Sequence, residues 1–96
     1  MRRVEIRFYL DPETGEPHIY DHNVSEEEVE EILAWPGEDL PAERNSRSIV
    51  GQTSAGRYLR IIAVRKPEIG IILVVTAYEL SPPQLAAYRR RRRKRR

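Results

Sequence analysis

The chain has 96 residues and no cysteine, which allows one small domain and excludes both a disulfide framework and a thiolate metal site. No apolar run approaches the roughly 20 residues of a membrane-spanning helix, and the N-terminus lacks the apolar region of a secretory signal, so we expect a cytoplasmic protein. Of the 17 Lys and Arg residues, eight are residues 89–96; because all 15 acidic residues precede them, residues 1–88 carry nine basic groups and a formal net charge of −6.

The first element that the sequence predicts is a β-strand. Residues 3–10 alternate between polar and apolar side chains, the period of a half-buried strand. The turn-forming residues Asp11 to Gly15 follow it. Residues 18–20 then fit either a short second strand or the approach to a helix.

That helix carries the clearest local signal in the chain. Ser25 is a good N-cap, and Glu28, three residues later, completes a capping box. Pro36-Gly37 predicts that the helix ends near Trp35. Its apolar stripe, which we expect to face the core, consists of Val29, Ile32 and Leu33.

The second half of the chain predicts an antiparallel meander. Residues 37–45 are polar and include a proline, so we expect a loop there. Short turns then separate three strand candidates, and short links join antiparallel neighbours; the candidates are residues 47–53, 57–64 and 69–78. The segment 71–77 is apolar on both faces, so we expect it to be central and covered on both sides.

The chain ends in a short helix and a basic tail. Ser81 and Gln84 form a second capping box, and Leu85 and Tyr88 are expected to dock the helix. Residues 89–96 contain no apolar side chain, and their like charges repel. We therefore expect a flexible tail, with residues 91–96 frayed or disordered.

Together these elements predict one α+β domain over residues 1–88. It contains a small antiparallel sheet of about four strands, one main helix and a short C-terminal helix. The charge asymmetry is typical of a tail that contacts nucleic acid or another polyanion. The predicted nucleic-acid-binding residues are Tyr58, Arg89, Arg90, Arg91, Arg92, Arg93, Lys94, Arg95 and Arg96.

Three segments also carry a family resemblance. The first, His-Ile-Tyr-Asp-His-Asn-Val-Ser-Glu-Glu-Glu-Val at 18–29, is similar to the Lys-His-Gly-Val-Ser-x-Glu-Glu-Ala signature of BrnT toxins and their uncharacterised relatives. The second, residues 51–62, resembles the Gly-x-x-x-Gly-Arg-x-Leu hairpin of the same group. The third, residues 75–78 with the basic run that follows, resembles its Ile-Ser-Ala-Arg-Lys strand and Arg-rich tail.

The resemblance implies a RelE-like fold of the RelE/ParE-like superfamily. It also implies a toxin of toxin–antitoxin type that cleaves RNA and is neutralised by a cognate antitoxin protein. By position, His22 matches the signature histidine and Arg57 the hairpin arginine. Two departures remove positive charge: Asp21 stands where those toxins carry Lys, and Tyr78-Glu79 stand where they carry Arg and Lys.

Metal-independent RNA cleavage needs a base, an acid and cations that stabilise the charged phosphorane. Histidine exchanges protons near neutral pH, arginine holds phosphate oxygens bidentately, and tyrosine stacks on bases. The candidate catalytic residues are therefore His18, His22, Arg57, Arg60 and Tyr78. We expect no cofactor and no metal, because the two histidines precede the helix and lack a nearby thiolate.

Strand geometry limits how these residues can combine. Alternate positions face opposite sides, so Arg57 and Arg60 point to opposite faces unless a bulge intervenes. Tyr58 shares the face of Arg60 and makes the better patch with it.

Three interpretations remain open from sequence alone. The first is a ribonuclease toxin of RelE/BrnT type. The second is a non-catalytic nucleic-acid- or ribosome-associated binding module that uses the Arg-rich tail. In the third, the tail pairs with the glutamates of residues 26–31, in the same chain or in a second copy as a homo-oligomer.

Overall fold

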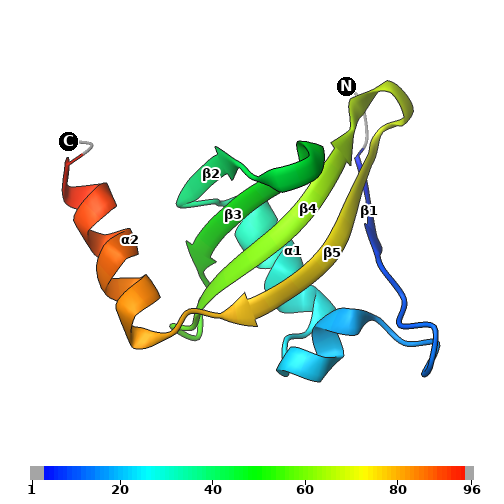
Figure 1. Ribbon diagram of the computed structural model, residues 1–96, viewed down its shortest axis with the longest axis horizontal. Helices are drawn as coiled ribbons and strands as arrows, with labels where there is room; N and C mark the ends of the chain where they lie inside the picture. Colours follow the sequence, from blue (N-terminus) through cyan, green and yellow to red (C-terminus); the bar gives the residue numbers. More distant parts are fainter. Residues whose placement is uncertain (1–3, 95–96) are drawn as a thin grey trace.

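Five strands form a single mixed sheet in the order β1-β5-β4-β3-β2 (Figure 1). The computed structural model describes residues 4–94. The strands are β1 (Glu5–Phe8), β2 (Glu38–Pro41), β3 (Arg47–Gln52), β4 (Tyr58–Lys66) and β5 (Ile71–Glu79). The helices are α1 (Glu26–Ala34) and α2 (Pro82–Lys94), with short 3₁₀ segments η1 (His18–His22), η2 (Glu43–Asn45) and η3 (Pro67–Ile69). The α+β class and the antiparallel meander of β3, β4 and β5 are confirmed.

The sheet differs from the expected one at both edges. The predicted loop 37–45 contains β2, which pairs antiparallel with β3. Pro41 is tolerated there because an edge strand has a side that needs no hydrogen-bond donor. At the other edge β1 pairs parallel with β5, from Glu5 opposite Ile71 to Phe8 opposite Val74, so the sheet has five strands and is mixed.

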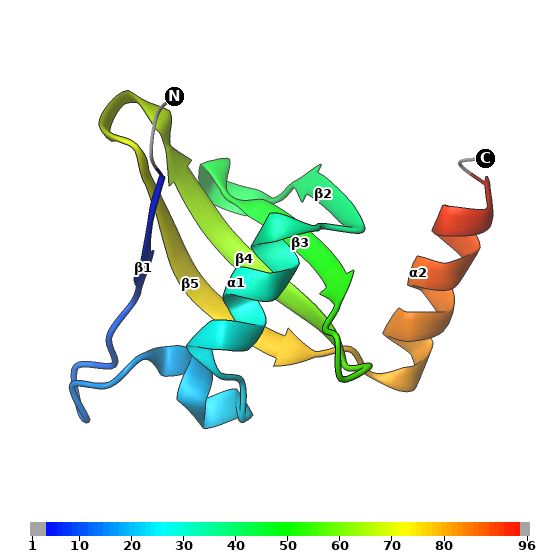
Figure 2. The ribbon, with the colours of Figure 1, turned by 180° about the vertical axis from the view of Figure 1, so that it is seen from behind.

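The main core lies between α1 and one face of the sheet (Figure 2). The capping box that starts α1 is confirmed: Ser25 Oγ accepts from Glu28 N at 3.2 Å, and Ser25 N donates to Glu28 Oε1 at 3.0 Å. Ile32 is fully buried against the sheet. A Cβ added at Gly51 would lie 2.9 Å from Ile32 Cγ2, so this glycine permits the close approach of helix and strand.

The opposite face of the sheet has little cover at β5. Figures 1 and 2 show α1 on one face only, with α2 beside the end of the sheet. On β5 only Val74 and Ala77 are buried, and Leu73 is half-buried. On the neighbouring β4, Ile62 is also half-buried. The expectation that β5 is central is confirmed, but the expectation that both its faces are covered is wrong.

The last helix is longer than expected. Its capping box is present, because Ser81 N donates to Gln84 Oε1 at 2.8 Å. The expected disorder is wrong for residues 91–94, which continue α2; residues 95 and 96 lie outside the described residues. Arg and Lys favour helix, and cations suit the negative end of the helix dipole. No helix within residues 4–94 is long and apolar enough to cross a membrane.

Candidate functional site

Helix α2 joins the sheet through a small second cluster of apolar side chains. Val50, Leu80 and Tyr88 are buried in it, and Tyr58 and Leu85 pack against them. The rings of Tyr58 and Tyr88 meet edge to face, with centroids 6.1 Å apart. This cluster holds α2 beside the face of the sheet that α1 leaves open.

An ion pair adds to this docking. Arg91 reaches Glu38 at the start of β2 with two hydrogen bonds, Nε to Oε2 at 2.7 Å and Nη2 to Oε1 at 2.9 Å. The Glu38 side chain is 3% exposed. The hydrogen bond that Arg91 donates to Glu38 raises the pKa of Arg91 above its usual value. Arg92 also donates to the carbonyl oxygen of Gly37. Arg91 is therefore a structural cation of the fold.

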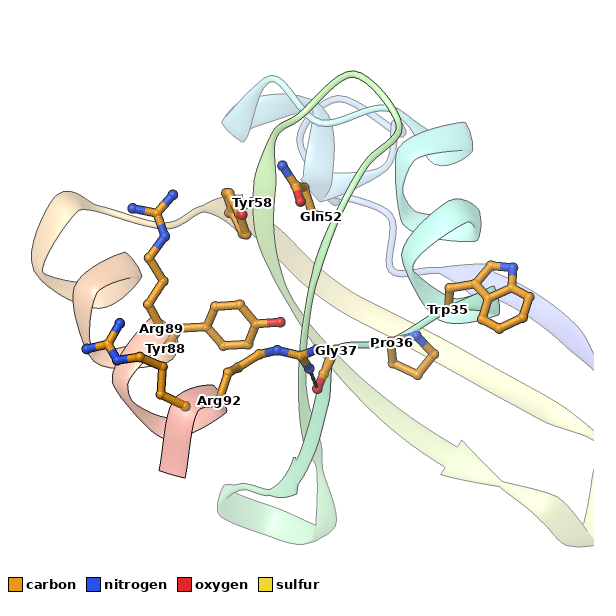
Figure 3. A pocket seen from close by; sticks show the side chains of 9 residues that line it. Trp35, Pro36, Gly37, Gln52, Tyr58, Tyr88, Arg89 and Arg92 are labelled. Carbon is orange, nitrogen blue, oxygen red and sulfur yellow. Dashed lines mark hydrogen bonds between the residues drawn. The ribbon is translucent and has the colours of Figure 1, made fainter. Parts of the chain in front are cut away.

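Between α2 and the sheet lies a cavity that we call the arginine groove (Figure 3). It has a volume of about 490 Å³ and is lined by Trp35, Pro36, Gly37, Gln52, Tyr58, Tyr88, Arg89, Arg92 and Arg93. The guanidinium carbon of Arg89 lies 5.3 Å from the centroid of the Tyr58 ring, and that of Arg92 lies 5.7 Å from the Tyr88 ring. A guanidinium held over a ring keeps N–H donors available for an anion.

The groove brings together part of the predicted nucleic-acid set. Tyr58, Arg89, Arg92 and Arg93 line it. Arg90 and Lys94 are exposed elsewhere on α2, and Arg95 and Arg96 lie outside the described residues. Sequence reasoning missed Trp35 and Gln52 as groove residues. The only available signal was the position of Trp35, directly after α1 and outside the apolar stripe.

A second cavity collects three of the predicted catalytic residues. This imidazole pocket, of about 390 Å³, is lined by Tyr9, His18, His22, Val75, Thr76 and Tyr78. It forms because β1 pairs with β5 only as far as Val74, so that η1 packs beside the rest of β5. The ring centroids of His18 and His22 are 5.3 Å apart, and those of His22 and Tyr78 are 6.1 Å apart. Tyr9 and Thr76 were not anticipated.

Two carboxylates flank the first histidine of this pocket. Nδ1 of His18 lies 3.5 Å from Asp21 Oδ2 and 3.9 Å from Asp11 Oδ2. At these distances the carboxylates form ion pairs with a protonated imidazole and not hydrogen bonds. Each of the three offers one ligand atom, and these atoms lie within 4.8 Å of one another, so the group could hold a metal ion. The same carboxylates place negative charge next to His18.

The structure does not bring Arg57 to the histidines. Its guanidinium donates to both carboxylate oxygens of Glu28 at 2.8 Å, to Glu79 at 3.4 Å and to the carbonyl of Asn23 at 3.0 Å. Desolvation alone would raise the pKa of Glu28, but hydrogen bonds from Ser25 and Arg57 outweigh it and lower that pKa. Arg57 lines neither cavity, and its guanidinium is already engaged by these three partners.

Arg60 occupies the position between the two cavities. The one bulge between β4 and β5 comes after it, at Ile62/Ala63, so Arg60 and Arg57 stay on opposite faces. Its cross-strand partner is Tyr78 of the imidazole pocket, and Tyr58 of the arginine groove precedes it by two residues on the same face. Its Nε is buried and has no hydrogen-bond partner within residues 4–94. Aromatic and cationic side chains therefore run from one cavity to the other.

In comparisons with known proteins, no family model matches the chain, and no curated protein or solved structure is significantly similar to it. The resemblance to BrnT toxins stays a prediction.

Proposed function

We propose that the protein binds RNA in the arginine groove and along the exposed face of α2. The observation that carries this proposal is the pair of arginines, Arg89 and Arg92, held over tyrosine rings at a cavity. A cationic track combined with aromatic platforms suits a polyanion that also has flat bases. An anion without rings would use the charge but not the tyrosines.

The charges of α2 support the same proposal. Arg89 and Arg93 form no ion pair with any residue between 4 and 94. They are four residues apart on one helix, as are Arg90 and Lys94, and like charges at this spacing repel. The acidic body, with its formal net charge of −6 over residues 1–88, supplies only Glu38 as a close partner for the described part of the basic run. A phosphate backbone would relieve the repulsion.

A titration at several salt concentrations tests RNA binding. Fluorescence anisotropy of a labelled 12-nucleotide RNA should show an affinity that falls steeply with salt. The double variant Arg89→Ala/Arg93→Ala should bind more weakly and reduce the magnitude of the log–log salt slope by about 1.4, because each single-strand phosphate contact contributes about 0.7.

The matched control removes two charges far from the groove. Arg7 lies on β1 and Lys66 at the end of β4, both exposed and away from α2. Arg7→Ala/Lys66→Ala should leave the slope unchanged. Equal effects of the two double variants would show that RNA does not bind at the groove. An affinity that does not depend on salt would refute the proposal.

A second candidate function, cleavage of the bound RNA, is favoured by one specific observation. His18 and His22 lie 5.3 Å apart beside Tyr78, and Arg60 neighbours Tyr78 across the strands. We propose that one imidazole takes the proton of the 2′-hydroxyl, which attacks the adjacent phosphate. The other imidazole gives a proton to the leaving 5′-oxygen. The products are a 2′,3′-cyclic phosphate and a free 5′-hydroxyl. This is the activity that the toxin interpretation requires, with an antitoxin as the partner.

Cleavage can be separated from binding by experiment. End-labelled single-stranded RNA should be cut by the protein with a chelator present. Either His18→Ala or His22→Ala should lower the rate by about 100-fold or more, while Tyr20→Phe, a change outside the pocket, should not. If the protein cuts no RNA, or if both histidine variants cut at the normal rate, the cleavage proposal is wrong and RNA binding is unaffected.

A further inference from the structure

The arginine groove has an exposed aromatic side chain at its edge in addition to its charged side chains. Trp35 is 85% exposed, more than any other large hydrophobic side chain within residues 4–94. Figure 3 shows Trp35 on the opposite side of Gly37 from Arg89 and Arg92. An indole in water exposes a large apolar surface, and aromatic side chains normally bury most of theirs.

The position of this indole is set by ordered backbone. Trp35 caps the C-terminus of α1, and its N–H donates to the carbonyl oxygens of Glu31 at 3.3 Å and Ile32 at 3.1 Å. Pro36 follows and restricts the backbone at the next position. The backbone therefore fixes the point at the edge of the groove from which the exposed ring projects.

The size and chemistry of the groove select among forms of RNA. Its volume of about 490 Å³ lies within the range of small-ligand clefts, about 300–1,000 Å³. In a duplex the base faces are stacked on one another, so aromatic side chains cannot reach them. Single-stranded RNA exposes its base faces, which stack on Trp and Tyr rings.

We propose that the arginine groove binds a single-stranded segment of RNA, with an unpaired base stacked on Trp35 and phosphates on Arg89 and Arg93. This inference rests on the proposed RNA binding and adds the strandedness of the ligand and a base contact. Gln52 lies in the same groove with an exposed side chain, whose amide donates one long hydrogen bond, of 3.4 Å, to the carbonyl oxygen of Gly56. Its amide is available to the edge of a base.

The protein carries its own reporter, because Trp35 is the only tryptophan in the chain. Titration with octauridylate should quench the fluorescence of Trp35, and a blunt RNA duplex of the same length should not quench it and should compete only weakly, through its phosphates. Anisotropy of labelled octauridylate should show that Trp35→Leu weakens binding by about tenfold or more, the range of stacking on one base. Trp35→Phe should retain most of the affinity.

Matched controls separate stacking from a general effect of mutation. Tyr20 is another exposed aromatic side chain, 45% exposed, and it lies outside the groove. Tyr20→Leu should bind octauridylate like the wild type. Since Trp35 is almost wholly in water, circular dichroism should show that its variants keep the native fold.

The outcomes distinguish this inference from the function on which it rests. If RNA binding depends on Arg89 and Arg93 but Trp35→Leu binds normally, or duplex binds as well as single strand, the inference is wrong and the proposed function stands. If no RNA binds at all, both are wrong. If a polyglutamate peptide displaces RNA and quenches Trp35 equally well, the groove is a docking site for an acidic protein and the inference is overturned.

Discussion

The ion pair between Arg91 and Glu38 should control the docking of α2. Removing one partner of a fully buried pair costs about 3–5 kcal/mol. Here the Glu38 side chain is 3% exposed but that of Arg91 is 39% exposed, so water screens the pair and can hydrate the remaining carboxylate. For Arg91→Ala we therefore expect a loss of about 2 kcal/mol, within the range for hydrogen bonds to charged groups.

This loss should be local. Apart from the ion pair and the Arg92 contact with Gly37, α2 is held mainly by the second apolar cluster. Breaking the pair should therefore release the helix before the sheet unfolds. About 2 kcal/mol corresponds to an about 30-fold larger equilibrium constant for opening, and therefore to about 30-fold faster amide exchange. Native-state hydrogen exchange should show this acceleration at α2 amides, with β4 amides unchanged.

Arg90→Ala is the matched control, because it removes the same charge from the next position, where the side chain is exposed. It should leave the exchange of α2 amides nearly unchanged. Equal acceleration by Arg90→Ala and Arg91→Ala would show that net charge, not the ion pair, governs docking. Acceleration spread equally over β4 would show that α2 is an integral part of the cooperative core. Either result would refute the reasoning.

Three further predictions concern the body of the domain. Ser25→Ala should lower the free energy of unfolding in urea by about 1 kcal/mol through loss of the cap. Gly51→Ala should lower it by about 1–3 kcal/mol by overpacking against Ile32 Cγ2, and it should cost less in an Ile32→Ala background, which lacks both γ-carbons. Because hydrogen bonds lower the pKa of Glu28 below its ordinary value, its stabilising effect is fully present above that ordinary value and is lost as the pH falls through the folded-state pKa. Glu28→Gln should therefore flatten the acid limb of a stability–pH curve, and an unchanged limb would show that its bond to Arg57 does not stabilise the fold.

Elements with strong local signals were predictable. The capping boxes at Ser25 and Ser81 are completed by residues three positions away, so these caps can be predicted from the local sequence. The three meander strands lie close to their predicted limits for a similar reason, since their turns are short. By contrast, β2 has little strand character of its own and exists because it pairs with β3.

The candidate site shows the same division. The sequence by itself determined that the charge is divided between an acidic body and a basic end, and that Tyr58 and Arg60 share a face. It could not distinguish one arginine of the basic run from the next.

Only the tertiary structure decided which arginine does what. Arg91 meets Glu38 from 53 positions away, Arg57 meets Glu28 from 29 positions away, and Arg89 lies over Tyr58. These contacts depend on how α2 and the sheet are placed in space, which packing of the whole chain sets and no local pattern encodes. For the same reason the sequence did not show that Trp35, the last residue before Pro36-Gly37, is an exposed residue at the edge of the arginine groove.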